Sequence, residues 1–182
     1  MIIRDCLSAD LPAITRIYAE SVENGVASYE LTAPDLAEMT RRHAALIADF
    51  YPYVVAEEAG EILGYAYASA FRTRPAYRWL VEDSIYLSPE ARGRGAGSAL
   101  LAELLNRCTA LGFRQMLAVI GGAHPASVAV HRKAGFIESG VIRATGYKHG
   151  RWLDTALMQI ALGNGDETDP DLQTYPGTLF RG

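Results

Sequence analysis

Cysteine is scarce in this sequence. The 182 residues include only Cys6 and Cys108, which is too few for a disulfide framework, and their wide separation is not the spacing of metal ligands. Both lie within apolar patterns, and free cysteine is among the most buried residue types. We therefore expect two buried free thiols and no metal site.

Long apolar runs and blocks of positive charge are also missing. No segment reaches the roughly 20 apolar residues that a membrane-spanning helix needs. Arg4 and Asp5 interrupt the early apolar run that a signal peptide would have. The formal net charge is -4, which argues against nucleic acid as the main partner. These absences predict a cytoplasmic protein whose partners include neither a membrane nor nucleic acid.

What is present fits an ordinary globular domain. Hydrophobic residues make up 49% of the sequence and charged residues 21%, and the length suffices for one domain with a sizeable core. We predict a single domain over residues 1–162. Residues 163–182 lose the apolar pattern and are predicted to form an extended or mobile C-terminal tail.

Hydrophobic periodicity predicts the order of the secondary structure elements. The order β-α-α-β-β-β-α-β-α-β-β indicates an α+β fold, with a mixed, mostly antiparallel central sheet and helices on both faces. The predicted helices span residues 11–24, 32–47, 98–111 and 125–135. The predicted strands lie at residues 1–6, in a hairpin over 51–71 with its turn at Ala59 and Gly60, at 81–88, at 115–121, and twice within 136–162.

Arginine and glycine alternate in the stretch SPEARGRGAGSALL, residues 88–101, where a predicted strand passes into a helix. The first amide groups of a helix have no partner inside it and carry a partial positive charge. The glycines leave that backbone open to a ligand, and Arg92 and Arg94 add two full charges. The stretch therefore favours a phosphate or pyrophosphate site over the alternative, a glycine-rich turn with solvated arginines.

The residues that follow exclude two other nucleotide-binding motifs. A P-loop would need Lys and then Ser or Thr after its last glycine, but Gly97 is followed by Ser98 and Ala99. A dinucleotide fingerprint would need glycine at residue 98 and an acidic residue at the end of the next strand. That strand, QMLAVIG, ends without one.

The sequence RGRGAG, after a strand ending in IYLSP, resembles the pyrophosphate loop of the GCN5-related N-acetyltransferases, the GNAT superfamily. The segments FRTRPAYRWLVEDSIYLSPEARGRGAGSALL, AVIGGAHPASVAVHRKAGF and GYKHGRWLDTALMQ are similar to its phosphinothricin N-acetyltransferase branch. The resemblance covers residues 1–162 and implies the acyl-CoA N-acyltransferase fold, acetyl-CoA as co-substrate, and a homodimer. The sequence departs from the branch at Leu80, where Thr is usual, and at His124, where an Asn commonly contacts coenzyme A.

The residues expected to bind acetyl-CoA form three groups. Residues 85–87 would pair with the pantetheine arm as an added strand, and the Leu87 amide would stabilise the oxyanion. The Arg-Gly stretch would hold the pyrophosphate, and the start of the last helix would contact coenzyme A. In full, these residues are Ile85, Tyr86, Leu87, Arg92, Gly93, Arg94, Gly95, Ala96, Gly97, Ser98, His124 and Ser127.

Two side chains are candidates for acid–base catalysis. Glu82 lies on the strand before the loop, where partial burial would raise its pKa, and the resemblance implies the role of general base. The alternative is a strand-edge carboxylate in solvent. We expect its neighbour Asp83 to point outward from the opposite face. The resemblance places His131 where many superfamily members carry a Tyr that protonates the thiolate. The alternative for His131 is a structural histidine on a short helix.

The acceptor site is expected to form from segments distant in the sequence. Arg72 and Arg74 could fork onto a carboxylate or phosphinate, although at least one of them is expected to be solvated. The residues expected to bind the acceptor are Tyr29, Arg72, Arg74, Tyr77, Glu82 and Lys148. Lys148 and Trp152 could complete the pocket across a dimer interface.

Together these features predict an N-acetyltransferase that moves the acetyl group of acetyl-CoA to a small acidic amine, such as phosphinothricin or methionine sulfoximine. Two alternatives stay open. The acceptor could be a protein N-terminus or another metabolite amine, or the chain could be a non-catalytic coenzyme A-binding sensor. The presence of both Glu82 and His131 disfavours the sensor.

Overall fold

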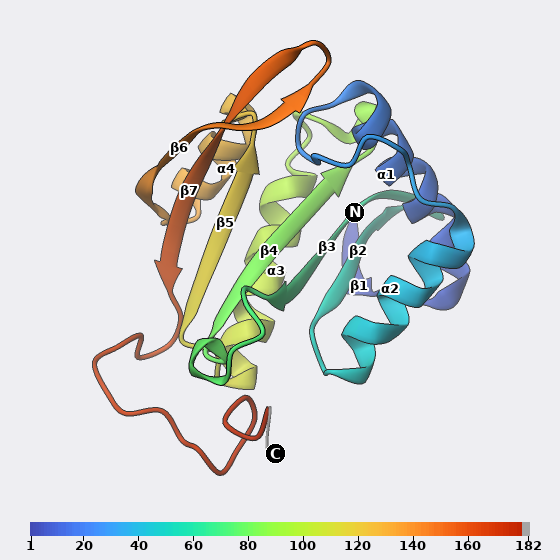
Figure 1. The fold of residues 1–182 in the computed structure, drawn as a ribbon. Helices are drawn as coiled ribbons and strands as arrows, with labels where there is room; N and C mark the ends of the chain where they lie inside the picture. The colour runs from blue at the N-terminus through green and yellow to red at the C-terminus, as the bar shows by residue number, and fades with distance from the viewer. Residues whose placement is uncertain (180–182) are drawn as a thin grey trace.

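The computed structural model describes residues 1–179, and its framework is a seven-stranded sheet in the order β1-β2-β3-β4-β5-β7-β6. The elements occur along the chain in the predicted order (Figure 1). The strands are β1 (Ile2–Asp5), β2 (Tyr53–Glu58), β3 (Glu61–Ala70), β4 (Leu80–Leu87), β5 (Gln115–Gly121), β6 (Ile137–Lys148) and β7 (Arg151–Ala161). The helices are α1 (Leu11–Asn24), α2 (Leu36–Ala48), α3 (Ala96–Leu111) and α4 (Pro125–Lys133), and short 3-10 turns lie at Ser8–Asp10, Pro75–Tyr77 and Pro89–Ala91.

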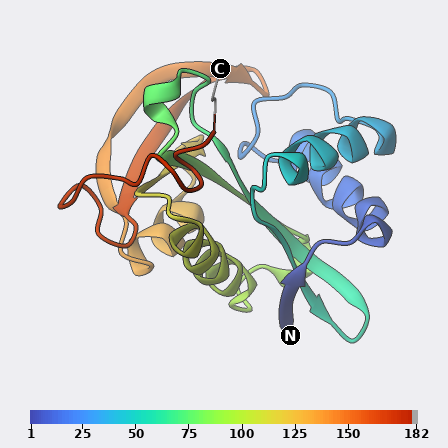
Figure 2. The same cartoon turned by 90° about the horizontal axis from the view of Figure 1, so that it is seen from below.

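The predicted fold class is confirmed. Every neighbouring pair of strands in the described sheet is antiparallel except β4 and β5, which run parallel. Figure 2 shows α1 and α2 on one side of the sheet and α3 on the other. A parallel pair needs a crossover connection, and here α3 supplies it.

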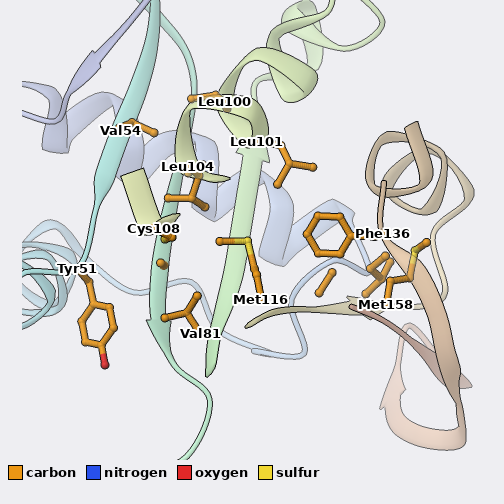
Figure 3. Packing of buried hydrophobic residues seen from close by; sticks show 14 of the residues in the cluster. Tyr51, Val54, Val81, Leu100, Leu101, Leu104, Cys108, Met116, Phe136 and Met158 are labelled. Atoms are coloured by element: carbon orange, nitrogen blue, oxygen red, sulfur yellow. The ribbon is translucent and has the colours of Figure 1, made fainter. Parts of the chain in front are cut away.

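The sheet has a hydrophobic core on each face. On the α3 side, Leu100, Leu101 and Leu104 have no solvent exposure, and they pack over strand residues such as Val81 and Met116 (Figure 3). The opposite core is formed by α1, α2 and the tyrosine-rich faces of β2 and β3. Because both faces are covered, a polar side chain on either face of a central strand is removed from bulk water.

The start of α2 differs from the prediction. The helix begins at Leu36 rather than near residue 32, because the carboxylate of Asp35 accepts the Glu38 amide at 2.8 Å and caps the first turn. The predicted hairpin turn is confirmed, with φ of 52° at Ala59 and 84° at Gly60.

The two cysteines are free, with Cys108 buried in the α3 core and Cys6 half-buried. No helix within residues 1–179 is long and apolar enough to cross a bilayer. Residues 163–179 contain no helix or strand and pass the ends of β4 and β5 where these strands begin (Figure 1). Residues 180–182 of the expected tail lie outside the described part.

Candidate active site

The site is built where β4 and β5 part. Their pairing runs from Leu80 opposite Gln115 to Asp83 opposite Ala118 and stops there. Beyond that point β4 pairs only with β3 and β5 only with β7. Figure 1 shows the two strands separating toward their C-terminal ends.

The parting leaves backbone groups of β4 without a strand partner. Ser88 donates its backbone N–H to Leu63 of β3 at 2.9 Å. Alternate residues of an antiparallel pair direct their backbone groups to the same neighbour, so Tyr86 also faces β3. Ile85 and Leu87 therefore direct their N–H and C=O groups toward the side that β5 has left.

The start of α3 supplies a second set of open donors. Gly93 and Gly95 have φ of 74° and 87°, and a Cβ built on either would meet no atom within 4 Å. The first backbone amide at this helix start to find an acceptor is Ala99, which donates to Gly95 at 3.0 Å. The amides just before Ala99 are thus free to bind an anion at the positive end of the helix.

The two loop arginines point elsewhere in this structure. Arg92 forms an ion pair with Glu20 of α1 at 2.7 Å, and Arg94 one with Glu58 of β2 at 2.5 Å. All four side chains are partly exposed, so each pair contributes little to stability. A hollow of about 350 Å³ beside Arg94 is lined by α1 and by residues 88–90.

Glu82 lies one residue before the parting. Side chains alternate along a strand, so Glu82 shares the face of Tyr86, which belongs to the α1/α2 side. Burial, and then the charge of Asp83, raise the pKa of the Glu82 carboxyl to about 6, against the opposing effect of Arg72. A carboxyl with this pKa is mostly ionised at neutral pH, yet it is more basic than an ordinary glutamate and is therefore suited to accept a proton there.

Asp83 corrects a prediction. It does point away from Glu82, but it is buried rather than outward-facing, because the helices on that face cover it. Its Oδ2 lies 2.9 Å from His131 Nε2 of α4, and its Oδ1 is buried without a hydrogen-bond partner.

His131 has both ring nitrogens engaged. Nδ1 lies 2.7 Å from the backbone oxygen of Ser127, and Nε2 faces Asp83. Burial would lower the pKa of His131, but the hydrogen bond to Asp83, its charge and the Ser127 carbonyl outweigh burial and raise that pKa. An acid role for His131 stays a prediction, and it requires one ring N–H to leave its present acceptor. His124 is exposed at the start of α4 and makes no capping hydrogen bond.

The segment of residues 25–30 is fixed against the ends of three strands. The Tyr29 hydroxyl contacts Thr155 Oγ1 at 2.7 Å and accepts the Gly122 amide at 3.1 Å. A Cβ at Gly146 would lie 2.8 Å from the Tyr29 ring, so glycine permits this approach. Lys148 is buried and donates to the Ser28 carbonyl at 2.8 Å. Burial lowers the pKa of its ammonium, opposed by Glu30.

The remaining acceptor candidates are on the surface. Arg72 and Arg74 are exposed in the connection from β3 to β4. The Arg72 guanidinium lies over the Phe71 ring at 4.4 Å, and Tyr77 packs edge-on against the same ring. Trp152 is 66% exposed beside Tyr147, at the turn between β6 and β7. The structure therefore brings Arg72 near Glu82, but Lys148 and Tyr29 are engaged in holding the 25–30 segment.

The sequence reading missed the Asp83–His131 pair. The signal was available: helices on both faces leave no outward-facing side for a central strand, so alternation from Glu82 predicts a buried partner for Asp83. Within residues 1–179, no group of three or more His, Cys, Asp or Glu side chains is placed to hold a metal ion.

Comparison with protein families supports this geometry. The model of the acetyltransferase (GNAT) family matches residues 12–136. This match spans α1 through α4 and includes the parted strands and the Arg-Gly loop.

Individual relatives extend the match. A phosphinothricin N-acetyltransferase of Alcaligenes faecalis is 47% identical over 163 residues, covering 89% of this chain and 83% of that protein. An L-methionine sulfoximine/L-methionine sulfone acetyltransferase of Pseudomonas paraeruginosa is 41% identical, covering 88% of this chain and 94% of that protein. The crystal structure of a GNAT superfamily phosphinothricin acetyltransferase from Sinorhizobium meliloti, in complex with AcCoA, is 63% identical, with a TM-score of 0.98 and coverage of 100% of this chain and 98% of the other.

Proposed function

This chain belongs to the GNAT acetyltransferase family, and we propose that it moves the acetyl group of acetyl-CoA to a small acidic amine of the phosphinothricin or methionine sulfoximine type. Relatives that carry those names match most of its length. We also propose that it acts in the cytoplasm, where acetyl-CoA is available.

One observation carries the proposal. A carboxyl with its pKa raised to about 6, that of Glu82, lies at the point where β4 leaves β5 and exposes unpaired backbone donors. Amine acetylation needs both features, a base for the amine and hydrogen-bond donors for the carbonyl. A sensor that only binds coenzyme A needs no such carboxyl.

The residues present fit acetyl-CoA, which supplies the acetyl thioester. The free amides before Ala99 and the positive end of α3 would hold its pyrophosphate. Arg92 and Arg94 would join them by exchanging Glu20 and Glu58 for phosphate oxygens, because surface ion pairs are weak enough to be replaced. The unpaired groups of Ile85 and Leu87 would hydrogen-bond the amide groups of the pantetheine arm and align the thioester.

The protein's own groups then account for the proton transfers. Glu82 takes a proton from the ammonium of the acceptor, directly or through water, so that the nitrogen can form the new C–N bond. The Leu87 amide donates to the carbonyl oxygen as that atom gains negative charge. When the C–S bond breaks, its electron pair stays on sulfur, and the His131–Asp83 pair is the proposed source of the proton that neutralises it.

The acidic group of the acceptor would be held by the connection from β3 to β4. Arg72 lies close enough to Glu82 to oppose the rise in its pKa, and Arg74 follows two residues later. A guanidinium binds carboxylate or phosphinate oxygens in a bidentate manner. An amine that carries an acid would therefore be held with its nitrogen directed to Glu82.

We also propose a homodimer formed through β6. This strand pairs only with β7 in the described sheet, and its first nine residues are exposed. Its side chains include Ile137 at 70%, Val141 at 54% and Ile142 at 47% exposure. An exposed apolar edge strand is a template for pairing with another chain.

The acceptor class is tested with a panel of amines. Thiol release from acetyl-CoA is measured with phosphinothricin, methionine sulfoximine, their esters, neutral amines and a peptide with a free N-terminus. We expect the free acids to be preferred. In the variant Arg72→Ala/Arg74→Ala the KM for the acids rises by roughly 10-fold to 100-fold, the range for a lost charge-assisted hydrogen bond. The KM for the esters changes little.

An equal rise in KM for acid and ester would show that Arg72 and Arg74 do not bind the acidic group. Peptide acetylation in preference to the acids would favour the protein N-terminus as acceptor, and no turnover with any amine would favour the sensor.

The base role is tested by the pH dependence of turnover at saturating acetyl-CoA. In the wild type, activity falls as pH falls through about 6, because Glu82 becomes protonated there. Glu82→Gln should lose about 10²–10⁴-fold in turnover. The loss should shrink as pH rises, because more of the amine is then neutral without help.

Asp83→Asn and His131→Gln test the source of the proton for the leaving thiolate. Their loss of turnover should not shrink at high pH, in contrast to that of Glu82→Gln. A Glu82→Gln enzyme within about threefold of the wild type at every pH would remove the base role, since general-base catalysis is worth far more.

The pyrophosphate site is tested by two opposite substitutions. Arg94→Ala should raise the KM for acetyl-CoA by roughly tenfold with little change in turnover, since a phosphate contact is the same in the ground and transition states. Glu58→Gln frees Arg94 from its ion pair and should leave that KM equal or lower. If Arg94→Ala leaves the KM for acetyl-CoA unchanged, its guanidinium does not bind the cofactor.

The dimer is tested by its mass in solution, measured by sedimentation. The wild type is expected to sediment as a dimer. Val141→Lys should yield monomers, because a charge in the middle of the interface stays unpaired. Leu31→Lys, at a site 73% exposed in the connection from α1 to α2, is the control and should stay dimeric. A monomeric wild type, or a dimeric Val141→Lys protein, would exclude this interface.

A further inference from the structure

Within the connection from β3 to β4, the side-chain packing is limited to Arg72 and Tyr77 on the Phe71 ring. Residues 72–77 are all exposed, and the only regular structure is the turn Pro75–Tyr77. Ordering an exposed segment costs conformational entropy, which contacts elsewhere must offset. What holds this connection in place therefore lies outside it.

Arg78 provides that contact. Its Nε donates to the carbonyl of Pro75 at 2.8 Å, within the connection. Its Nη1 donates to the carbonyl of Gly177 at 2.8 Å and reaches that of Leu179 at 3.5 Å. One guanidinium thus joins the acceptor-side connection to a segment about a hundred residues later in the chain. A planar guanidinium suits this task because its donors have a fixed geometry.

The segment that Arg78 contacts is itself anchored. Tyr175 packs edge-on against Phe113 and Phe50, and its hydroxyl donates to the Asp49 carbonyl at 2.9 Å. Arg114 donates to the carbonyls of Gly165 and Thr168 at 2.6 Å. Figure 2 shows residues 163–179 crossing this end of the molecule. The anchors are the ends of α2 and α3, so the segment offers Arg78 a fixed acceptor.

The connection leaves β3 beside the candidate base and enters β4 at Leu80, two residues before Glu82. The β3–β4 pairing ends with Ala70 opposite Val81, next to Ser69 opposite Glu82. A shift of the connection therefore changes where Arg72 and Arg74 stand relative to Glu82. Small displacements of positioning groups can cost about 10²-fold in rate.

We propose that residues 163–179 are an acceptor-positioning element that acts through Arg78. The element fixes the β3–β4 connection so that its arginines face the acceptor while the amine reaches Glu82. This inference rests on the proposed acetyl transfer, but it concerns a different part of the chain from the acetyl-CoA site. Arg78 is a positioning residue, because its Nε and Nη1 donate to backbone carbonyls and it acts on the acceptor through the connection.

The experiment compares the KM for the acceptor with the KM for acetyl-CoA. It uses variants of both partners in the hydrogen bond between Arg78 and Gly177. Arg78→Ala removes the guanidinium. Gly177→Ala displaces the carbonyl, because a Cβ there would lie 2.3 Å from the Asp171 oxygen. Each variant should raise the KM for the acidic acceptor by roughly tenfold, the equivalent of one charge-assisted hydrogen bond, and leave the KM for acetyl-CoA unchanged. The double variant should be no worse than Arg78→Ala, because both changes break the same contact.

Arg114→Ala is the matched control. It removes an arginine that grips the same segment at Gly165 and Thr168 without its side chain contacting the connection. We expect it to lower thermal stability but to leave both Michaelis constants unchanged, because Tyr175 still anchors the stretch next to Gly177. Arg78→Lys retains a single donor group and should fall between the wild type and Arg78→Ala.

The outcomes separate this inference from the proposed function. If the panel of amines shows a different preferred acceptor, that amine replaces the acid in the comparison and the positioning role is still measured. An unchanged acceptor KM in Arg78→Ala and Gly177→Ala overturns the inference, as does a parallel rise in both Michaelis constants. Should Arg78→Ala fail to fold, the same comparison is made with Arg78→Lys and Gly177→Ala.

Discussion

The parallel strands β4 and β5 stop pairing halfway along β4 and leave backbone groups without partners. The candidate site is arranged around these unpaired groups. Unpaired amides and carbonyls cost free energy wherever water cannot reach them, so the parting of β4 and β5 is a place where a ligand can replace missing protein contacts. The helix start beside it repeats the same principle, with donors that no carbonyl satisfies. Both sets of donors open toward the same end of the sheet (Figure 1).

The two faces of β4 carry acidic side chains in different surroundings. Glu82 and Asp83 are neighbours in sequence, yet their surroundings differ. Glu82 is half-buried, and the charges of Asp83 and Arg72 have opposite effects on its pKa, whereas Asp83 is buried against the His131 imidazole. Environment rather than residue type thus separates their roles: the carboxyl without a hydrogen-bonding partner is left able to exchange a proton, and the paired one holds α4 against the sheet.

The sequence was sufficient for what depends on local pattern. Periodicity and glycine positions predicted every strand and helix in order, and the Arg-Gly stretch predicted the open helix start. Contacts between distant segments could not be predicted, because no local pattern indicates them. Examples are the ion pair of Arg92 with Glu20 and the hydrogen bonds from Lys148 to Ser28 and from Arg78 to Gly177. The loss of apolar pattern after residue 162 correctly predicted that this segment has no helix or strand. It did not predict that Tyr175 anchors the segment.

The position of β5 in the sheet also sets an order of events during synthesis. β5 shares only four residue pairs with β4, which emerges earlier, and seven with β7, which follows two intervening elements. While the ribosome adds residues at about 5–20 per second, this apolar strand keeps an open edge until residues 151–161 have been made. The interval lasts on the order of seconds, and during it the unpaired edge of β5 is open to pairing with strands of other chains.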